Sequence, residues 1–410
     1  MAVASNKYAV KRYAKALSAV ALATAMLGYS AVSNAGATFK IDDTKWVSIG
    51  AGFRTSFTAT EEAAAGSKWS NDFSVDNMRL YLNAQIHEYI KLEFNTECQF
   101  CGTNGGDMKI LDAIAKFEFT PYINLWVGRM LVPAERREMN GPFYSAVYNI
   151  FSTGTPFDSA DFGGPAGIGP DQAGIYGRDD GVTLWGSVLE GRLQYAFGIF
   201  NGLRGSANED DNLLYAQRVS YNFWDVEKNP GYYTSGTYYG AGGDILTLGV
   251  SNQYQEDGAG TRFDKGDFRG TAVDILMEKV LANGGVVTIS GEYKNYAVSN
   301  GYSQASRDSG APGWNMFEGD AYDISAMYLF PQKIAIGQFQ PFIRYTNTLP
   351  EDSSDRAAWE AGLNYVIDGH NALVSLNWHY GDRITKGLDY SSDADGDKVH
   401  SITIGFQLQI

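Results

Sequence analysis

Few side chains in this sequence have the type and spacing that covalent or metal chemistry requires. The two cysteines, Cys98 and Cys101, are separated by two residues. No helical pattern follows them, as a redox motif would require, and no histidine follows for haem attachment. A zinc site would need two further ligands, and none is evident. In an exported protein, such a close pair predicts a disulfide that staples a loop.

The remaining candidates for chemistry are weak. The segment Asp393-Ala394-Asp395-Gly396-Asp397 resembles part of a calcium loop, but it lacks the glutamate that closes an EF-hand. We expect a solvated loop there, and divalent cations bridging it to lipopolysaccharide are left open. The four histidines are scattered, and no base lies beside a nucleophile in the pattern. The sequence therefore predicts no enzymatic activity, no metal site and no cofactor.

The first 35 residues have the pattern of a secretory signal peptide. Basic residues occur between Lys7 and Lys15, no acidic residue precedes Asp42, and an apolar run follows from Ala16 to about Val32. Small residues place the cleavage site after Ala35 or Ala37. Removal of residues 1–35 changes the net charge from −15 to about −19. A chain this acidic is not expected to bind nucleic acid.

The C-terminal segment has the clearest secondary-structure signal. Apolar side chains from Ile402 to Ile410 alternate with polar or small residues from Ser401 to Gln409. Successive side chains of a strand point to opposite faces, so this segment predicts one apolar and one polar face. The same alternation recurs along the chain and predicts sixteen strands. They lie near 46–58, 74–87, 90–98, 109–119, 123–130, 181–188, 192–200, 213–223, 244–255, 268–279, 285–297, 320–330, 338–347, 356–367, 372–382 and 398–410.

The connections between these strands alternate in length. Connections after odd-numbered strands are mostly long, including 59–73, 131–180 and 256–267, whereas most of the others are short turns. Bacterial outer-membrane barrels have long outer loops and short periplasmic turns. Residues 224–243 break this rule, because they are long on the short side. The pattern predicts an all-β, sixteen-stranded antiparallel transmembrane β-barrel over residues 36–410, rather than a secreted β-sandwich or β-helix.

The chain resembles the phosphate-selective porin O and P family of sixteen-stranded trimeric porins over essentially its whole mature length. The residues that carry the resemblance are Val127-Gly128-Arg129 with Val132-Pro133, Gly177 through Val182, and Pro230-Gly231-Tyr232-Tyr233 through Asp244-Ile245-Leu246. The resemblance implies a homotrimer in the outer membrane of a Gram-negative bacterium, surrounded by lipid and lipopolysaccharide. Outer-membrane barrel chains commonly end in an aromatic residue, whereas the last residue of this sequence is Ile410.

The longest connection, about 131–180, is the expected constriction loop, folded inward from the outer side. A sixteen-stranded barrel is too wide for side chains alone to fill, so selectivity requires a segment inside it. Opposed charges across the narrowing would set the ion preference. The charged loop residues predicted to do so, together with one at the end of the preceding strand, are Arg129, Glu135, Arg136, Arg137, Asp158, Asp161, Arg178 and Asp179.

Basic residues at inward positions of the predicted strands complete the expected pore lining. They are Arg54, Arg79, Lys116, Arg218, Lys294 and Arg344, and acidic residues such as Glu93, Glu292 and Glu360 share the same rows. The family resemblance implies phosphate or other small anions, whereas the acidic net charge points the other way. We therefore predict a porin for small polar solutes or ions. The alternatives are a structural or adhesive barrel that sheathes a partner protein and, less favoured, an outer-membrane hydrolase.

Overall fold

The computed structural model describes residues 36–99, 101, 108–150, 177–205, 207–299, 318–351, 355–382 and 398–410. The predicted signal peptide lies outside the described residues. Among the residues that the structure describes, no helix is long and apolar enough to cross a membrane.

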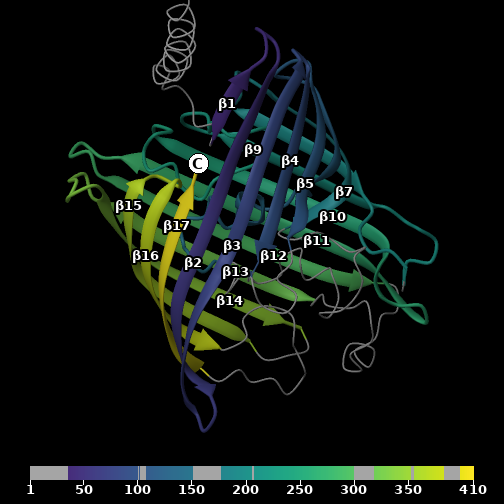
Figure 1. The fold of residues 1–410 in the computed structure, drawn as a ribbon. Coiled ribbons are helices and arrows are strands. Elements are labelled where there is room, and N and C mark those ends of the chain that lie inside the picture. Colours follow the sequence, from purple (N-terminus) through teal and green to yellow (C-terminus); the bar gives the residue numbers. More distant parts are fainter. Residues whose placement is uncertain are drawn as a thin grey trace, which may run out of the picture. The chain divides into compact units, whose positions relative to one another are not determined.

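Sixteen antiparallel strands form a closed barrel. Each strand from β2 to β16 pairs with the next one, and β17 returns to pair with β2 through Gln409↔Gly52 to Ser401↔Thr60. Figure 1 shows this closure, with β17 in yellow beside β2 in purple. The strands are β2 (Trp46–Ala64), β3 (Lys68–His87), β4 (Ile90–Gln99), β5 (Lys109–Glu118), β6 (Asn124–Leu131), β7 (Arg178–Val188), β8 (Leu193–Phe200), β9 (Leu214–Asn222), β10 (Ile245–Thr261), β11 (Asp264–Val280), β12 (Val286–Ser299), β13 (Gly319–Leu329), β14 (Gln338–Pro350), β15 (Arg356–Asp368), β16 (Ala372–Asp382) and β17 (Lys398–Gln409). The predicted number and order of strands in the barrel are therefore confirmed.

A short additional strand, β1 (Ala37–Lys40), was not expected from the sequence. It pairs with the first residues of β2, from Ala37↔Ile49 to Lys40↔Trp46. The ladder between β17 and β2 begins only at Gly52, so β1 occupies the part of the β2 edge that β17 does not reach.

Two predicted long loops are instead extended hairpins. β2 and β3 pair as far as Ala64↔Lys68, and β10 and β11 pair as far as Thr261↔Asp264. The expected loops 59–73 and 256–267 are therefore mostly strand. The backbone ladders continue beyond the segments in which apolar and polar residues alternate. Strands predicted from the alternation alone are therefore too short at these two hairpins.

The exposure of alternate side chains is the reverse of that in a soluble protein. In β17, Leu408 is 58% exposed while its neighbours Gln407 and Gln409 are buried. Ile402, Ile404 and Phe406 are likewise exposed, and Ser401 and Thr403 are buried. The closed ladder pairs the backbone within the protein, as lipid requires, and the apolar face is the one that suits contact with lipid. We call the inward-facing set of each strand its inner row.

The two ends of the barrel differ in their connections. At one end, here called the short-turn end, lie turns such as 88–89, 119–123, 281–285 and 369–371. The long segment 223–244 between β9 and β10 also leaves the strands at this end. The opposite end carries the hairpin tips and the long connections, including 132–177 between β6 and β7.

Candidate functional site in the barrel interior

The described part of the long β6–β7 connection, residues 132–150, is almost entirely buried. It contains one helical turn, α2 (Arg136–Asn140), which begins after Glu135; the Glu135 side chain accepts a hydrogen bond from the backbone N–H of Glu138 (3.3 Å). A carboxylate at this position satisfies an N–H that the helix leaves unpaired. All five residues of α2 are buried, although three of them are charged.

Ion pairs with inner-row carboxylates, and with Glu227 of the segment 223–244, hold α2 against several strands. Arg136 lies 2.6 Å from Glu227 and 3.5 Å from Asp274 of β11. Arg137 lies 3.0 Å from Glu292 of β12 and also contacts Asp323 of β13. A buried charge of this kind is tolerated only where its partners replace the lost water, so these contacts fix the position of the loop.

Further pairs extend this cluster along the wall. Lys294 of β12 lies 2.6 Å from Glu135 of the loop. Arg344 of β14 donates from Nε to Asp323 (2.7 Å) and also contacts Glu360 of β15. Arg218 of β9 donates to Asp274 (2.9 Å between Nη2 and Oδ1). The loop and the inner rows from β9 to β15 thus share one network of alternating charges.

The second half of the described loop packs against the inner rows of β2 and β3, through Arg54, Asp76 and Arg79. The guanidinium carbon of Arg79 lies 4.8 Å from the centre of the Phe143 ring, and that of Arg54 lies 4.0 Å from the centre of the Tyr148 ring. The Tyr148 hydroxyl donates to Asp76 (2.7 Å). These stacked cations are held by aromatic faces as well as by polar partners.

An apolar patch in the loop explains an irregularity of the inner row of β14. Phe342 interrupts an otherwise polar row in the sequence. In the structure it is buried in a cluster with Val147 and Ile150 of the loop, and with Leu111 and Met327. The apolar inner-row residue therefore marks the place where the loop packs on the wall.

The second insert is the segment 223–244, whose length the loop rhythm did not explain. Tyr232 packs against Trp126 of β6 with ring centres 5.2 Å apart, and its hydroxyl donates to the carbonyl of Leu131 (2.6 Å). The Thr234 hydroxyl donates to the carbonyl of Arg136 (2.7 Å). The segment thus contacts both the inner wall and α2.

Glu278 of β11 anchors the same segment. This fully buried carboxylate accepts hydrogen bonds from the Thr237 hydroxyl (2.7 Å) and from the backbone N–H groups of Tyr238 (3.0 Å) and Gly240 (2.7 Å). The Thr288 hydroxyl donates to it from β12 (3.1 Å). Sequence reasoning did not select Glu278, because its partners lie in a segment whose path the strand pattern does not predict.

Glu227 and His370, which both lie outside the strands, have shifted pKa values. Burial tends to raise the pKa of Glu227, but the charge and hydrogen bonds of Arg136 outweigh burial and lower it to about 2. Burial lowers the pKa of His370, in the turn 369–371, to about 4 despite a hydrogen bond with the Thr237 carbonyl. Glu227 is therefore charged and His370 neutral near pH 7.

The structure brings most of the predicted pore residues into paired positions. Lys116 contacts Glu93, Arg79 contacts Glu97, and Arg178 lies 3.1 Å from Asp112. Asp179 accepts a hydrogen bond from the backbone N–H of Gly202 (2.6 Å). The pairs at Arg54, Glu135, Arg136, Arg137, Arg218, Lys294 and Arg344 are described above. Asp158, Asp161 and the Asp393–Asp397 segment lie outside the described residues.

Arg129 is placed differently from the expectation that it faces the pore. It lies on the same face of β6 as Val127, which is 41% exposed on the outer surface. Its guanidinium lies 2.7 Å from Asp180 of β7, the residue directly opposite it. Trp126, one residue from Val127, is fully buried on the inner row. The alternation along β6 thus turns Trp126 inward and Arg129 outward, contrary to the prediction that Arg129 lines the pore.

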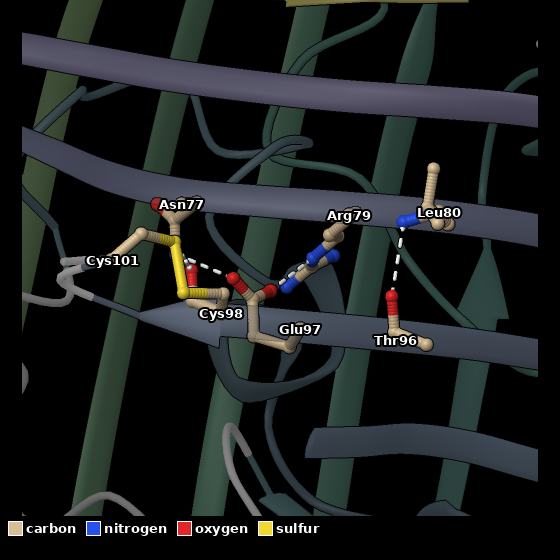
Figure 2. Close-up of a disulfide and its surroundings, with 7 residues drawn as sticks. All are labelled: Asn77, Arg79, Leu80, Thr96, Glu97, Cys98 and Cys101. Atoms are coloured by element: carbon tan, nitrogen blue, oxygen red, sulfur yellow. Dashed lines mark hydrogen bonds and ion pairs between the residues drawn. A yellow bond between two sulfur atoms is a disulfide. The ribbon is translucent and has the colours of Figure 1, made fainter. Parts of the chain in front are cut away.

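Cys98 and Cys101 form a disulfide at the end of β4 (Figure 2). The adjacent Glu97 points to the inner row, where it accepts a hydrogen bond from Asn77 (3.0 Å) and pairs with Arg79. The disulfide therefore ties the start of the β4–β5 connection to a strand whose neighbouring residue belongs to the interior charge network. Within the described ranges, no group of three or more His, Cys, Asp or Glu side chains is placed to hold a metal ion.

Comparisons with known proteins support the fold and no closer relationship. No family model matches the sequence, and no curated protein matches it. Among solved structures, an anion-selective porin from Comamonas acidovorans is 12% identical with a TM-score of 0.57, over 89% of this chain and 100% of that one. OprB of Pseudomonas putida is 7% identical with a TM-score of 0.56, over 89% and 94%. OmpT of Vibrio cholerae is 15% identical with a TM-score of 0.54, over 91% and 100%.

The chain thus shares its barrel fold with these three proteins. At such low identity the likeness extends to the fold alone, and the similarity to the phosphate-selective porin O and P family rests on the sequence motifs.

Proposed function

We propose that this protein is an outer-membrane porin through which small polar solutes or ions diffuse passively. The observation that carries the proposal is the closed barrel with an apolar outer face and charged, polar inner rows, against which a long connection is fixed by ion pairs. A barrel of this size leaves an aqueous interior unless an insert narrows it. Residues 1–35 are its proposed signal peptide, and the short-turn end its periplasmic side.

We further propose that residues 132–150 form the constriction together with the segment 223–244. Both inserts are held by buried charges, as in the contact between Arg136 and Glu227. A narrowing built from such paired charges restricts solute size more strongly than it selects the sign of an ion, because each charge has a partner nearby.

The names of the structural neighbours bear on two further properties, the ion preference and the oligomeric state. One neighbour is described as an anion-selective porin, and one OmpT structure as a trimer form. We propose a homotrimer for this chain as well. Anion preference receives less support, because the described basic residues of the predicted pore set are bound to carboxylates or to other acceptors.

Single-channel recording in planar lipid bilayers tests the porin and the constriction together. Removing residues 140–170 leaves Arg136 and Arg137 in place and should raise the conductance severalfold. The matched control removes residues 62–69 at the exposed tip of the β2–β3 hairpin and should leave conductance unchanged. An unchanged conductance in the first variant would exclude the constriction role.

A structural barrel is the second candidate, because the inner rows of β9–β17 are nearly all buried. A barrel that only sheathes a partner protein should give no current even after residues 140–170 are removed. The wild-type protein should be folded in each case, as judged by the different migration of heated and unheated samples in gel electrophoresis.

A further inference from the structure

We propose that the solute path runs along the inner face of β3, β4 and β5 at the short-turn end of the barrel, and that its charges are balanced. This proposal rests on the proposed porin function. It starts from the exposure of inner-row side chains. Asn83 and Gln85 of β3 are partly exposed, and the side chains of Lys91, Glu93 and Glu118 are 34%, 14% and 20% exposed.

On the opposite wall, inner-row side chains near the same end are covered. Those of Thr247, Glu278, Thr288, Gln340, Ser375 and Gln407 are at most 2% exposed. The two walls consist of similarly polar residues, so composition does not explain the difference. A covering segment must account for it.

The segment 223–244 covers the wall from β11 to β15. Glu278, which also accepts a hydrogen bond from Thr288, accepts one from its Thr237. Tyr239 packs on Val286, Leu329 and Val366 of β12, β13 and β15.

The loop 132–150 covers the adjoining wall toward β2. Its Phe143 carbonyl accepts a hydrogen bond from Gln407 of β17 (2.9 Å), and its Ala146 carbonyl accepts one from Asn364 of β15 (2.9 Å). The Tyr148 carbonyl accepts a hydrogen bond from Arg54 of β2. With these walls covered, water and solutes have access to the β3–β5 wall.

The charges on this wall occur as neighbouring opposite pairs. Lys91 of β4 lies 2.6 Å from Glu118 of β5, and Lys116 of β5 contacts Glu93 of β4. Trp126 holds both pairs in place, because its indole N–H donates to Glu118 (3.1 Å) and the Lys116 ammonium lies 3.9 Å from the centre of its ring.

Alternating ammonium and carboxylate groups fit solutes that carry a dipole or both signs of charge. A phosphate would have to displace a carboxylate from each lysine. We therefore infer that small neutral polar and zwitterionic solutes are the class that this wall favours.

Substituted cysteines test the position of the path in the full-length protein. Asn83→Cys and Ser375→Cys are recorded in bilayers before and after addition of a cationic methanethiosulfonate reagent. The two native cysteines are joined in a disulfide and should not react. We expect the reagent to reduce the N83C current by roughly half or more, because it fills the narrow passage, and to leave the S375C current unchanged.

The outcomes separate the two proposals. A reagent effect at Ser375 but not at Asn83, or at neither position in a conducting channel, would overturn the path while leaving the porin function intact. The absence of current from the wild-type protein would instead reject the porin function, and the path with it.

Charge substitutions test the balance of the wall. Lys91→Gln leaves Glu118 without its cationic partner and should shift the reversal potential in a KCl gradient toward cations. Glu118→Gln should shift it in the opposite direction, with about a twofold change in permeability ratio in each case. Lys333→Gln, on the exposed turn 330–337, is the control and should have no effect. Shifts of the same sign in both variants, or no shift in either, would contradict the proposal.

Discussion

Asp323 is the inner-row carboxylate that joins the loop to the wall most directly, since it binds both Arg137 and Arg344. Asp323→Asn removes the charge shared by two buried guanidinium groups. We expect the variant to lose on the order of 3 kcal/mol of unfolding free energy, as measured by denaturant unfolding in detergent micelles. Asp368→Asn, at the exposed end of β15, is the control and should change it little. Equal stability of the two variants would show that the network does not hold the loop.

His370 should make the packing at the short-turn end sensitive to acid. Its Nε2 contacts the Thr237 carbonyl and the Ser235 hydroxyl, and the rings of Tyr144 and Tyr239 face it from the two inserts. These tyrosines are the titratable groups among its contacts, and both are neutral in the acidic range. A proton on His370 therefore gains no carboxylate partner there.

The expected pH dependence follows from the lowered pKa of His370, about 4 against an ordinary value of 6.5. The folded state binds fewer protons than the unfolded state between these values, so stability is complete above pH 6.5. It falls as the pH decreases toward 4, by up to about 3 kcal/mol. His370→Gln should reduce this dependence, measured as the unfolding midpoint at pH 7 and pH 4.5. The same loss in both proteins would assign it to other groups.

Single residues were the scale at which sequence reasoning was least complete. Strict alternation predicted the inner position of Arg344, and in the structure it is buried there. The alternation did not reveal its partners, because the contact with Asp323 depends on which strand residues lie opposite one another. Arg129 was misplaced because a strand ending in a run of apolar residues, Met130 to Val132, gives no clear alternation. Phe342 and Trp126 were the available signals that something packs inside the barrel.

At the scale of elements, the two inserts differ in how far the sequence predicted them. The length of the β6–β7 connection singled it out. The segment 223–244 was marked by a break in the loop rhythm and by one of the motifs of the family resemblance, and neither predicted its path. Its path depends on contacts between residues far apart in the chain, such as Tyr232 with Trp126 and Tyr239 with His370. Such contacts leave no periodic pattern in the sequence.

Gly231 offers a direct test of the second insert. Its φ is +63°, and a Cβ atom at this position would overlap the indole ring of Trp126. We expect Gly231→Ala to displace Tyr232 from the wall and to increase the single-channel conductance by roughly twofold. Gly66→Ala is a matched control, because Gly66 also has a positive φ (+73°) but no atom near the added Cβ.

The comparison between these two glycine variants separates backbone strain from packing. Both substitutions place an alanine in the left-handed region, and this backbone strain alone should lower stability by a similar amount, about 1 kcal/mol. The overlap with Trp126 should lower the stability of Gly231→Ala further. Only Gly231→Ala should also alter the channel. Equal conductance of the two variants would show that the segment 223–244 does not narrow the path.

For the molecule as a whole, the sequence predicted closure of the barrel because the same two-residue period recurs in sixteen segments joined by alternating long and short connections. Periodicity and turn length are local properties, so they can be recognised in the sequence without knowledge of the three-dimensional structure. What the barrel admits is different, because it depends on which of the interior charges remain unpaired after folding. The net charge of the chain and the family resemblance pointed in opposite directions on this question.

The paired interior charges lead to a prediction about phosphate. An anion site needs basic donors that are not already neutralised by carboxylates, and on the β3–β5 wall both Lys91 and Lys116 are bound to glutamates. We therefore expect up to ~1 mM phosphate to leave the KCl current of the wild-type channel unblocked. Glu93→Gln leaves Lys116 without its carboxylate, and in this variant phosphate should reduce the current measurably. Block of the wild-type channel at micromolar phosphate would mean that a cluster of unpaired cations does line the path, and the anion preference implied by the family resemblance would then replace the balanced wall.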